Sequence, residues 1–201
     1  MLRAARLGIE RGGVPLLQGL DLTLEAGAAL ILRGPNGIGK TSLLRVLAGL
    51  QPPMEGQLEA APAAYAGHRD GVKPTLTVAE NLFFWAETYG GSVPDALWEA
   101  FDLGRLRGRP GGALSAGQTR RLGLARLAVT GRRLLLLDEP TVSLDAASVA
   151  RFADWLRAHL AGGGAAIVAT HVALGLEAPE LDLAPFRALA GARGGSDEAF
   201  L

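Results

Sequence analysis

Residues 34–41, GPNGIGKT, form a glycine-rich stretch that ends in a lysine and a threonine. Glycines at 34, 37 and 39 would let the backbone wrap phosphate oxygens with its N–H groups pointing inward. We expect Lys40 to reach the β- and γ-phosphates of a nucleotide, and the Thr41 hydroxyl to bind Mg²⁺. A glycine turn before a chance Lys–Thr pair is the simpler alternative. The predicted nucleotide-contacting residues are consecutive: Gly34, Pro35, Asn36, Gly37, Ile38, Gly39, Lys40, Thr41 and Ser42.

A second set of chemical residues follows two apolar runs. Asp138 and Glu139 come directly after RLLLL, and His171 comes after AAIVAT. A carboxylate at the end of a buried strand suits a hydrated Mg²⁺, so Asp138 is predicted to bind the metal together with Thr41. Glu139 would polarise an attacking water as general base or orienter, and His171 would sense the γ-phosphate. The alternative for the acidic pair is a helix cap.

The surrounding pattern predicts the elements that must bring these residues together. Apolar periodicity and turn residues indicate two strands within 16–33, a helix from 40, a weak strand over 57–65, and strands before Asp138 and His171. Thr77 and Glu80 form a capping-box pattern for a helix through Tyr89, and 145–160 is also helical. Alternation of strands and helices indicates an α/β core with a parallel sheet, interrupted by a mostly helical segment over 67–130.

Composition narrows the possible classes of protein. The 201 residues are 49% hydrophobic and carry 20 basic and 20 acidic side chains, so no overall charge favours nucleic acid or an anionic membrane. The absence of cysteine excludes disulfides and thiol chemistry. No run of about 18 apolar residues and no signal-peptide pattern occur, so we expect a cytoplasmic protein. One domain over 1–190 and a flexible tail over 191–201 are predicted.

The stretch LSAGQTRRLGLARL, residues 114–127, separates this chain from other phosphate-loop proteins. LSAGQ resembles the signature motif of the ATP-binding-cassette (ABC) ATPases, SLDAAS from Ser143 resembles their D-loop, and His171 matches their switch histidine. The resemblance implies a P-loop NTPase with a RecA-like parallel-sheet core, an antiparallel β subdomain and a helical subdomain. It also implies ATP hydrolysis with Mg²⁺. A small-molecule kinase would leave both LSAGQ and SLDAAS as coincidences.

In ABC proteins two copies associate head to tail, and the signature of one covers the ATP of the other. The resemblance therefore implies that Ser115, Gly117 and Gln118 contact the γ-phosphate held by a second copy, and that a bulky residue at 117 would hold the copies apart. The three basic side chains that follow, Arg120, Arg121 and Arg126, are interpreted as a solvated helix face.

Two positions depart from the usual ABC pattern. His68 stands where the family has a glutamine that binds Mg²⁺, and imidazole is a poorer ligand for this hard cation. We expect His68 to contact water or phosphate. Arg11 falls near the place where many ABC domains stack an aromatic ring on adenine, and it could stack through its guanidinium plane.

The short length and His68 make the chain similar to the ATPase subunits of bacterial cytochrome c maturation systems. That resemblance implies a haem-transporting translocase ATPase at the cytoplasmic face of the inner membrane, with CcmB/CcmC-like membrane permease subunits as partners. No haem-attachment pattern occurs, so no direct haem site is expected, nor a nucleic-acid partner. Residues 72–85, VKPTLTVAENLFFW, are predicted to dock the permease. Alternatives are an ABC transporter for another substrate or a soluble ABC-type ATPase acting on DNA or ribosomes.

Overall fold

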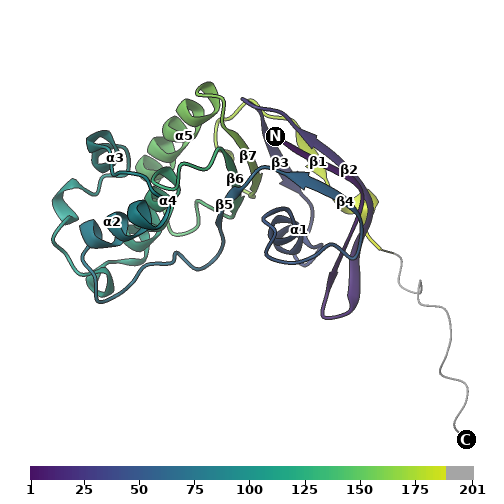
Figure 1. The fold of residues 1–201 in the computed structure, drawn as a ribbon, viewed down its shortest axis with the longest axis horizontal. Coiled ribbons are helices and arrows are strands. Elements are labelled where there is room, and N and C mark those ends of the chain that lie inside the picture. Colours follow the sequence, from purple (N-terminus) through teal and green to yellow (C-terminus); the bar gives the residue numbers. More distant parts are fainter. Residues whose placement is uncertain (189–201) are drawn as a thin grey trace, which may run out of the picture.

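A parallel sheet of five strands forms the centre of the computed structural model, which describes residues 1–188 (Figure 1). Its order is β5-β6-β7-β3-β8, and its strands are β3 (Ala29–Arg33), β5 (Ala63–Ala66), β6 (Leu134–Asp138), β7 (Ala165–Ala169) and β8 (Glu180–Asp182). Every residue of β6 and β7 is buried, as expected for apolar runs covered on both faces. The predicted tail over 191–201 lies outside the described residues.

A second, antiparallel sheet has the order β2-β1-β4. Its strands are β1 (Leu2–Arg11), β2 (Val14–Leu24) and β4 (Glu55–Ala60). The prediction of one weak strand over 57–65 was wrong, because the chain forms β4 there, leaves it at Ala61–Pro62 and enters the parallel sheet as β5. Proline has no N–H to donate to a sheet ladder, so Pro62 suits the point where the chain changes sheets.

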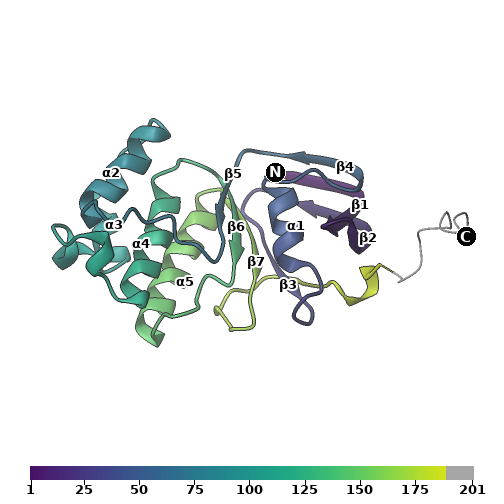
Figure 2. The same cartoon turned by 90° about the horizontal axis from the view of Figure 1, so that it is seen from below.

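The helices are divided between the two faces of the parallel sheet (Figures 1 and 2). Helix α1 (Lys40–Leu47) packs with the antiparallel sheet on one face, through a core that includes Leu134 and Leu136. Leu135 and Leu137, which point the other way, join the core on the opposite face. On that face α4 (Ala116–Ala128) and α5 (Ala146–Ala161) lie next to the sheet, and α2 (Val78–Thr88) and α3 (Asp95–Ala100) lie beyond them, α2 against α4 and α3 against α5.

Short 3₁₀ turns complete the described chain at Gly104–Leu106, Gly111–Ala113 and Ala184–Phe186. Within residues 1–188, no helix combines the length and the apolar character needed to cross a bilayer.

The predicted capping box of α2 is confirmed. The Thr77 hydroxyl accepts a hydrogen bond from the Glu80 N–H at 3.2 Å, and the Glu80 carboxylate accepts one from the Thr77 N–H at 2.7 Å. The hydrogen bonds that the Glu80 carboxylate accepts from the Thr77 N–H and from the Thr77 hydroxyl lower the pKa of Glu80. Helix α4 begins with the same arrangement, since Ser115 and Gln118 bond each other's backbone N–H groups. Local sequence therefore fixes where both helices begin.

Candidate functional site

The candidate site lies where four neighbouring strands of the parallel sheet end. The carboxyl ends of parallel strands meet at one edge, which is where ligands bind in open α/β sheets. In spatial order, β5 leads into the loop 67–70, β6 ends at Asp138, β7 leads to His171, and β3 leads into the glycine-rich loop. Because β7 lies between β6 and β3, the topology places His171 between Glu139 and Lys40.

The glycine-rich loop is closed around the Lys40 amine. Lys40 is the first residue of α1 and is 8% exposed. Its amine donates hydrogen bonds to the carbonyls of Gly34 at 2.6 Å and Pro35 at 3.3 Å. Gly34, Gly37 and Gly39 have φ angles of 136°, 81° and 115°, which other residues adopt only with strain. The buried ammonium and the start of α1 give this loop a positive potential suited to phosphates.

Some of the remaining residues predicted to contact the nucleotide are buried, and others are exposed to solvent. Ile38 is 6% exposed and packs in the core beneath the loop, whereas Pro35 and Asn36 are exposed. Ser42 is 8% exposed in the first turn of α1. The loop is therefore anchored in the core through Ile38 and faces solvent at Pro35 and Asn36.

Thr41 and Asp138 are brought together although they are 97 residues apart. The Thr41 hydroxyl donates to Asp138 Oδ2 at 2.7 Å, and Asp138 is 2% exposed. A hydroxyl beside a carboxylate fits Mg²⁺, which binds few protein oxygens and keeps water and phosphate oxygens as its other ligands. No group of three or more His, Cys, Asp or Glu suited to a metal occurs in residues 1–188, so the fit depends on this pair with a nucleotide.

His68 and Tyr65 lie beside the same carboxylate. His68 Nε2 is 3.8 Å from Asp138 Oδ2, and the His68 side chain is 72% exposed. Burial and the charge of Asp138 raise the pKa of Tyr65 to about 12, so its hydroxyl stays protonated. His68 thus lies exposed beside the residues predicted to bind the metal, and its contact with water or phosphate stays a prediction.

Lys40, His171 and Glu139 form a row across the edge of the sheet. His171 Nε2 is 3.4 Å from Lys40 Nζ and 3.6 Å from Glu139 Oε1. Glu139 has a φ of 47°, an uncommon left-handed conformation, and its N–H donates to the Ala169 carbonyl at 2.8 Å. The arrangement brings together the Lys40 ammonium, which can bind phosphate, the His171 imidazole, and the Glu139 carboxylate, which can polarise water.

The signature residues lie elsewhere in the same chain. Ser115, Gly117 and Gln118 begin α4, on the face of the sheet opposite α1 (Figure 1). Ser115 makes local hydrogen bonds: its carbonyl accepts from the Thr119 hydroxyl at 3.0 Å, besides the capping bonds with Gln118. These residues are therefore not assembled with the glycine-rich loop of their own chain.

Gly117 is also constrained within its own chain. A Cβ at this position would lie 2.8 Å from the Ser143 carbonyl oxygen. Ser143 has a φ of 68°, so the D-loop segment is itself held in a left-handed conformation. The sequence interpretation gave only an intermolecular reason for a small residue at 117, and the structure adds this contact between the two motifs.

The interpretation of the three arginines as a solvated face was wrong. Arg120 is 6% exposed, Arg121 bonds the Asp102 carbonyl at 3.0 Å, and Arg126 is half-buried with its guanidinium 5.0 Å from the Trp85 ring. Burial lowers the pKa of Arg126. Position 120 precedes Leu124 by one helical turn, so helical periodicity could have placed it on the buried face. Arg11, at the end of β1, is exposed.

A cavity of about 500 Å³ lies beside the metal residues. Thr41 and His68 line it, together with Trp85 of α2 and Tyr89, which directly follows α2. The Trp85 and Tyr89 rings are stacked with centroids 6.2 Å apart. Phe83 and Phe84 nearby are 52% and 38% exposed. Apolar surface on α2 and the metal residues thus border one cleft.

The sequence profile of the ABC transporter family matches residues 17–142. The chain belongs to the ABC transporter family. It is 61% identical, over 93% of each chain, to the cytochrome c biogenesis ATP-binding export protein CcmA of Ruegeria pomeroyi. This similarity places it in the CcmA group of ABC proteins, and the predicted ATP-hydrolysing activity follows from that membership.

Solved ABC structures have the same fold. An ABC transporter ATP-binding protein from Pyrococcus furiosus superposes with a TM-score of 0.80 at 23% identity, covering 93% of this chain and 99% of the other. A dimeric ABC cassette, MJ0796 bound to ADP and Pi, gives 0.75 at 20% identity, covering 86% and 88%. The predicted ABC fold is confirmed, and a small-molecule kinase is excluded.

Proposed function

We propose that this protein is the ATPase subunit of a cytochrome c maturation transporter, and that its ATP hydrolysis serves haem export or delivery. The observation that carries the ATPase part is the row of Lys40, His171 and Glu139 beside the Thr41–Asp138 pair. The similarity to a CcmA protein supports the cytochrome c part. A transporter ATPase for another substrate is the second candidate, and the same geometry favours it equally.

In the proposed hydrolysis, Lys40 leaves its loop carbonyls and binds the β- and γ-phosphates of ATP. Thr41 and Asp138 would hold Mg²⁺, which neutralises charge on the phosphates when bound. Glu139 accepts a proton from a water that attacks the γ-phosphorus, while the bond from phosphorus to the β–γ bridging oxygen breaks. His171 holds the γ-phosphate from between the two, and His68 contacts water at the metal residues.

The second copy completes the site in this proposal. The α4 N-terminus of one copy, with Ser115, Gly117 and Gln118, covers the γ-phosphate bound by the other. The place of α4 on the sheet face opposite α1 supports this arrangement, because one chain does not assemble its own signature and loop. ATP then holds the copies together, and loss of phosphate separates them.

We further propose that the complex lies at the cytoplasmic face of the inner membrane with CcmB/CcmC-like permease subunits. The permease would dock at α2 and the cleft beside it, because Trp85 and the exposed Tyr89 line that cleft together with Thr41. Phe83 and Phe84, on the same helix, add exposed aromatic surface next to it. Neither haem nor nucleic acid is expected to bind this subunit directly.

Replacing Phe83 or Phe84 with glutamine is expected to reduce recovery with membranes by at least about tenfold, because exposed aromatic anchors dominate docking surfaces. ATP affinity should not change, since neither ring touches the phosphate loop. Sedimentation with membranes from the source organism measures this, with Val14→Gln as control because Val14 is 60% exposed on the antiparallel sheet. Wild-type membrane recovery of both aromatic variants would contradict the docking proposal.

Deletion of the gene in the source organism tests the whole function. The proposal expects loss of c-type cytochromes with b-type cytochromes retained, and rescue by the wild-type chain but not by Lys40→Ala. Normal c-type cytochromes in the deletion strain would overturn the cytochrome c role and leave the second candidate.

A further inference from the structure

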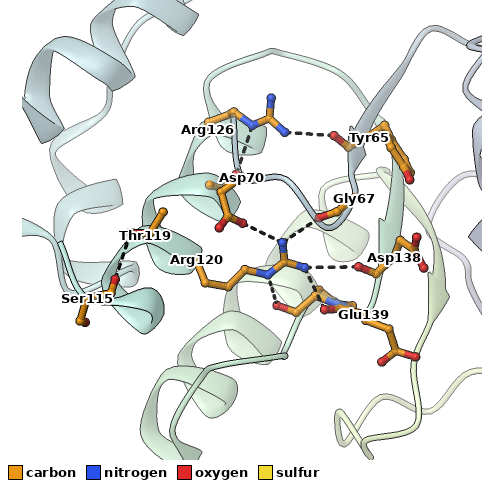
Figure 3. A network of polar contacts seen from close by, with 11 residues as sticks. Tyr65, Gly67, Asp70, Ser115, Thr119, Arg120, Arg126, Asp138 and Glu139 are labelled. Carbon is orange, nitrogen blue, oxygen red and sulfur yellow. Dashed lines mark hydrogen bonds and ion pairs between the residues drawn. The ribbon is translucent and has the colours of Figure 1, made fainter. Parts of the chain in front are cut away.

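The Arg120 side chain occupies an unusual position for a cation. It is 6% exposed, and its guanidinium donates hydrogen bonds to five oxygens (Figure 3). Four are backbone carbonyls and one is a carboxylate: Pro140 at 2.9 Å, Gly67 at 2.8 Å, Glu139 at 2.8 Å, Asp138 at 3.3 Å, and Asp70 Oδ1 at 2.8 Å. A guanidinium carries five N–H donors in a rigid plane, so this set uses its full fork geometry.

These acceptors belong to two segments that meet at the site. Gly67 and Asp70 flank His68 in the loop after β5, and the other three carbonyls belong to residues 138–140, where β6 ends. Arg120 itself comes from α4, five residues after Ser115. One buried side chain therefore joins the helix that begins with the signature to the His68 loop and to Glu139.

The close packing of α4 against the His68 loop is independent of this ion pair. A Cβ at Gly123, one turn along α4 from Arg120, would lie 2.6 Å from Asp70 Cβ. The Asp70 side chain is 19% exposed and is thus held between the Arg120 guanidinium and the Gly123 backbone. Such a buried pair is costly unless every donor is bonded, and breaking one partner leaves the other uncompensated.

The consequence for Glu139 comes from its backbone. Glu139 has a φ of 47°, which costs an L-residue energy unless its surroundings enforce it. Arg120 bonds the Glu139 carbonyl, while the Glu139 N–H donates to Ala169 at 2.8 Å. Both backbone polar groups of Glu139 are thereby hydrogen-bonded. Its carboxylate oxygen Oε1 lies 3.6 Å from His171 Nε2.

We propose that Arg120 is a positioning residue for ATP hydrolysis, with Asp70 as its charge partner. Arg120 fixes the backbone of Glu139, so that the carboxylate is directed at the attacking water. It also connects that backbone to α4, the helix that begins with the signature residues. Phosphate binding by Lys40 does not depend on it, because the five hydrogen bonds of the Arg120 guanidinium go to the segments 67–70 and 138–140 and not to the glycine-rich loop. This inference rests on the role of Glu139 proposed above.

The test is steady-state hydrolysis by the full chain with Arg120 replaced by lysine, which keeps the charge but loses the planar fork. We expect kcat to fall by about 100-fold, as for a misplaced catalytic group, with KM for ATP within about twofold of wild type. The control is Arg121→Lys, one residue along α4, whose bonds go to the carbonyls of Phe101 and Asp102 and to the Asp102 carboxylate. The control should retain wild-type kcat and KM.

A second comparison separates positioning from a general loss of structure. In a Glu139→Gln background, Arg120→Lys should cause no further loss of the residual hydrolysis, because the group that it positions is already inactive. If Arg120→Lys does not fold, Asp70→Asn carries the test: reduced kcat at unchanged KM supports the proposal, and wild-type kcat overturns it.

A wild-type kcat in Arg120→Lys would overturn the inference. It would also be overturned if Arg120→Lys reduced hydrolysis by the same factor in the wild-type and in the Glu139→Gln background. Wild-type hydrolysis by Glu139→Gln alone would instead overturn the proposed role of Glu139. The two failures are therefore distinguishable.

Discussion

Glu139→Gln is expected to lower the rate of ATP hydrolysis by at least about 100-fold, the usual contribution of a positioned general base. Glutamine has nearly the same shape but does not accept a proton from water. Affinity for ATP should stay near that of the wild type, because the carboxylate lies 3.6 Å from His171, beyond the lysine that meets the phosphates. Single-turnover phosphate release measures the rate, and a fluorescent ATP analogue measures the affinity.

Glu59→Gln is a matched control for this prediction. Glu59 is an exposed carboxylate on β4 of the antiparallel sheet, away from the edge where the site lies. Hydrolysis should be unaffected there. If Glu139→Gln released phosphate as fast as this control, another group would have to activate the water.

Lys40→Ala is expected to weaken ATP binding by about 100-fold, since hydrogen bonds to charged groups are the stronger class and a phosphate chain carries several charges. The Lys40 amine is held at 2.6 Å from the Gly34 carbonyl at the mouth of the loop. Isothermal titration with ATP measures the loss.

Lys73→Ala provides the control for the lysine prediction. The Lys73 amine lies 4.3 Å from the centre of the Phe84 ring beside α2, rather than in the glycine-rich loop. Its removal should leave ATP affinity unchanged. Equal affinities of Lys40→Ala and wild type would contradict the phosphate role of Lys40.

The sequence predicted the placement of the site well because each chemical residue follows an apolar run. Asp138 ends β6 and His171 follows β7, and both strands are fully buried. Parallel pairing alone then brings the strand ends to one edge. The 2.7 Å contact of Thr41 with Asp138 follows from this arrangement without any further signal in the sequence.

The sequence predicted less well where a side chain has two possible environments. Arg120 looked like part of a solvated face, since an arginine on an amphipathic helix is usually exposed. Its burial depends on Asp70, 50 residues away, and on carbonyls whose directions the local pattern does not reveal. The division of 57–65 between two sheets was missed for a similar reason, because strand pairing is decided by distant partners.

Self-association of the Glu139→Gln chain with Mg-ATP tests the central claim most directly, namely that two copies share each ATP. Sedimentation equilibrium should give twice the chain mass with saturating ATP and the single mass without it. Ser115→Asp in the same background should prevent the dimer, because aspartate still caps α4 but repels phosphate, whereas the neutral cap Ser115→Asn should allow it. A single-chain mass for Glu139→Gln at saturating Mg-ATP would contradict the shared site.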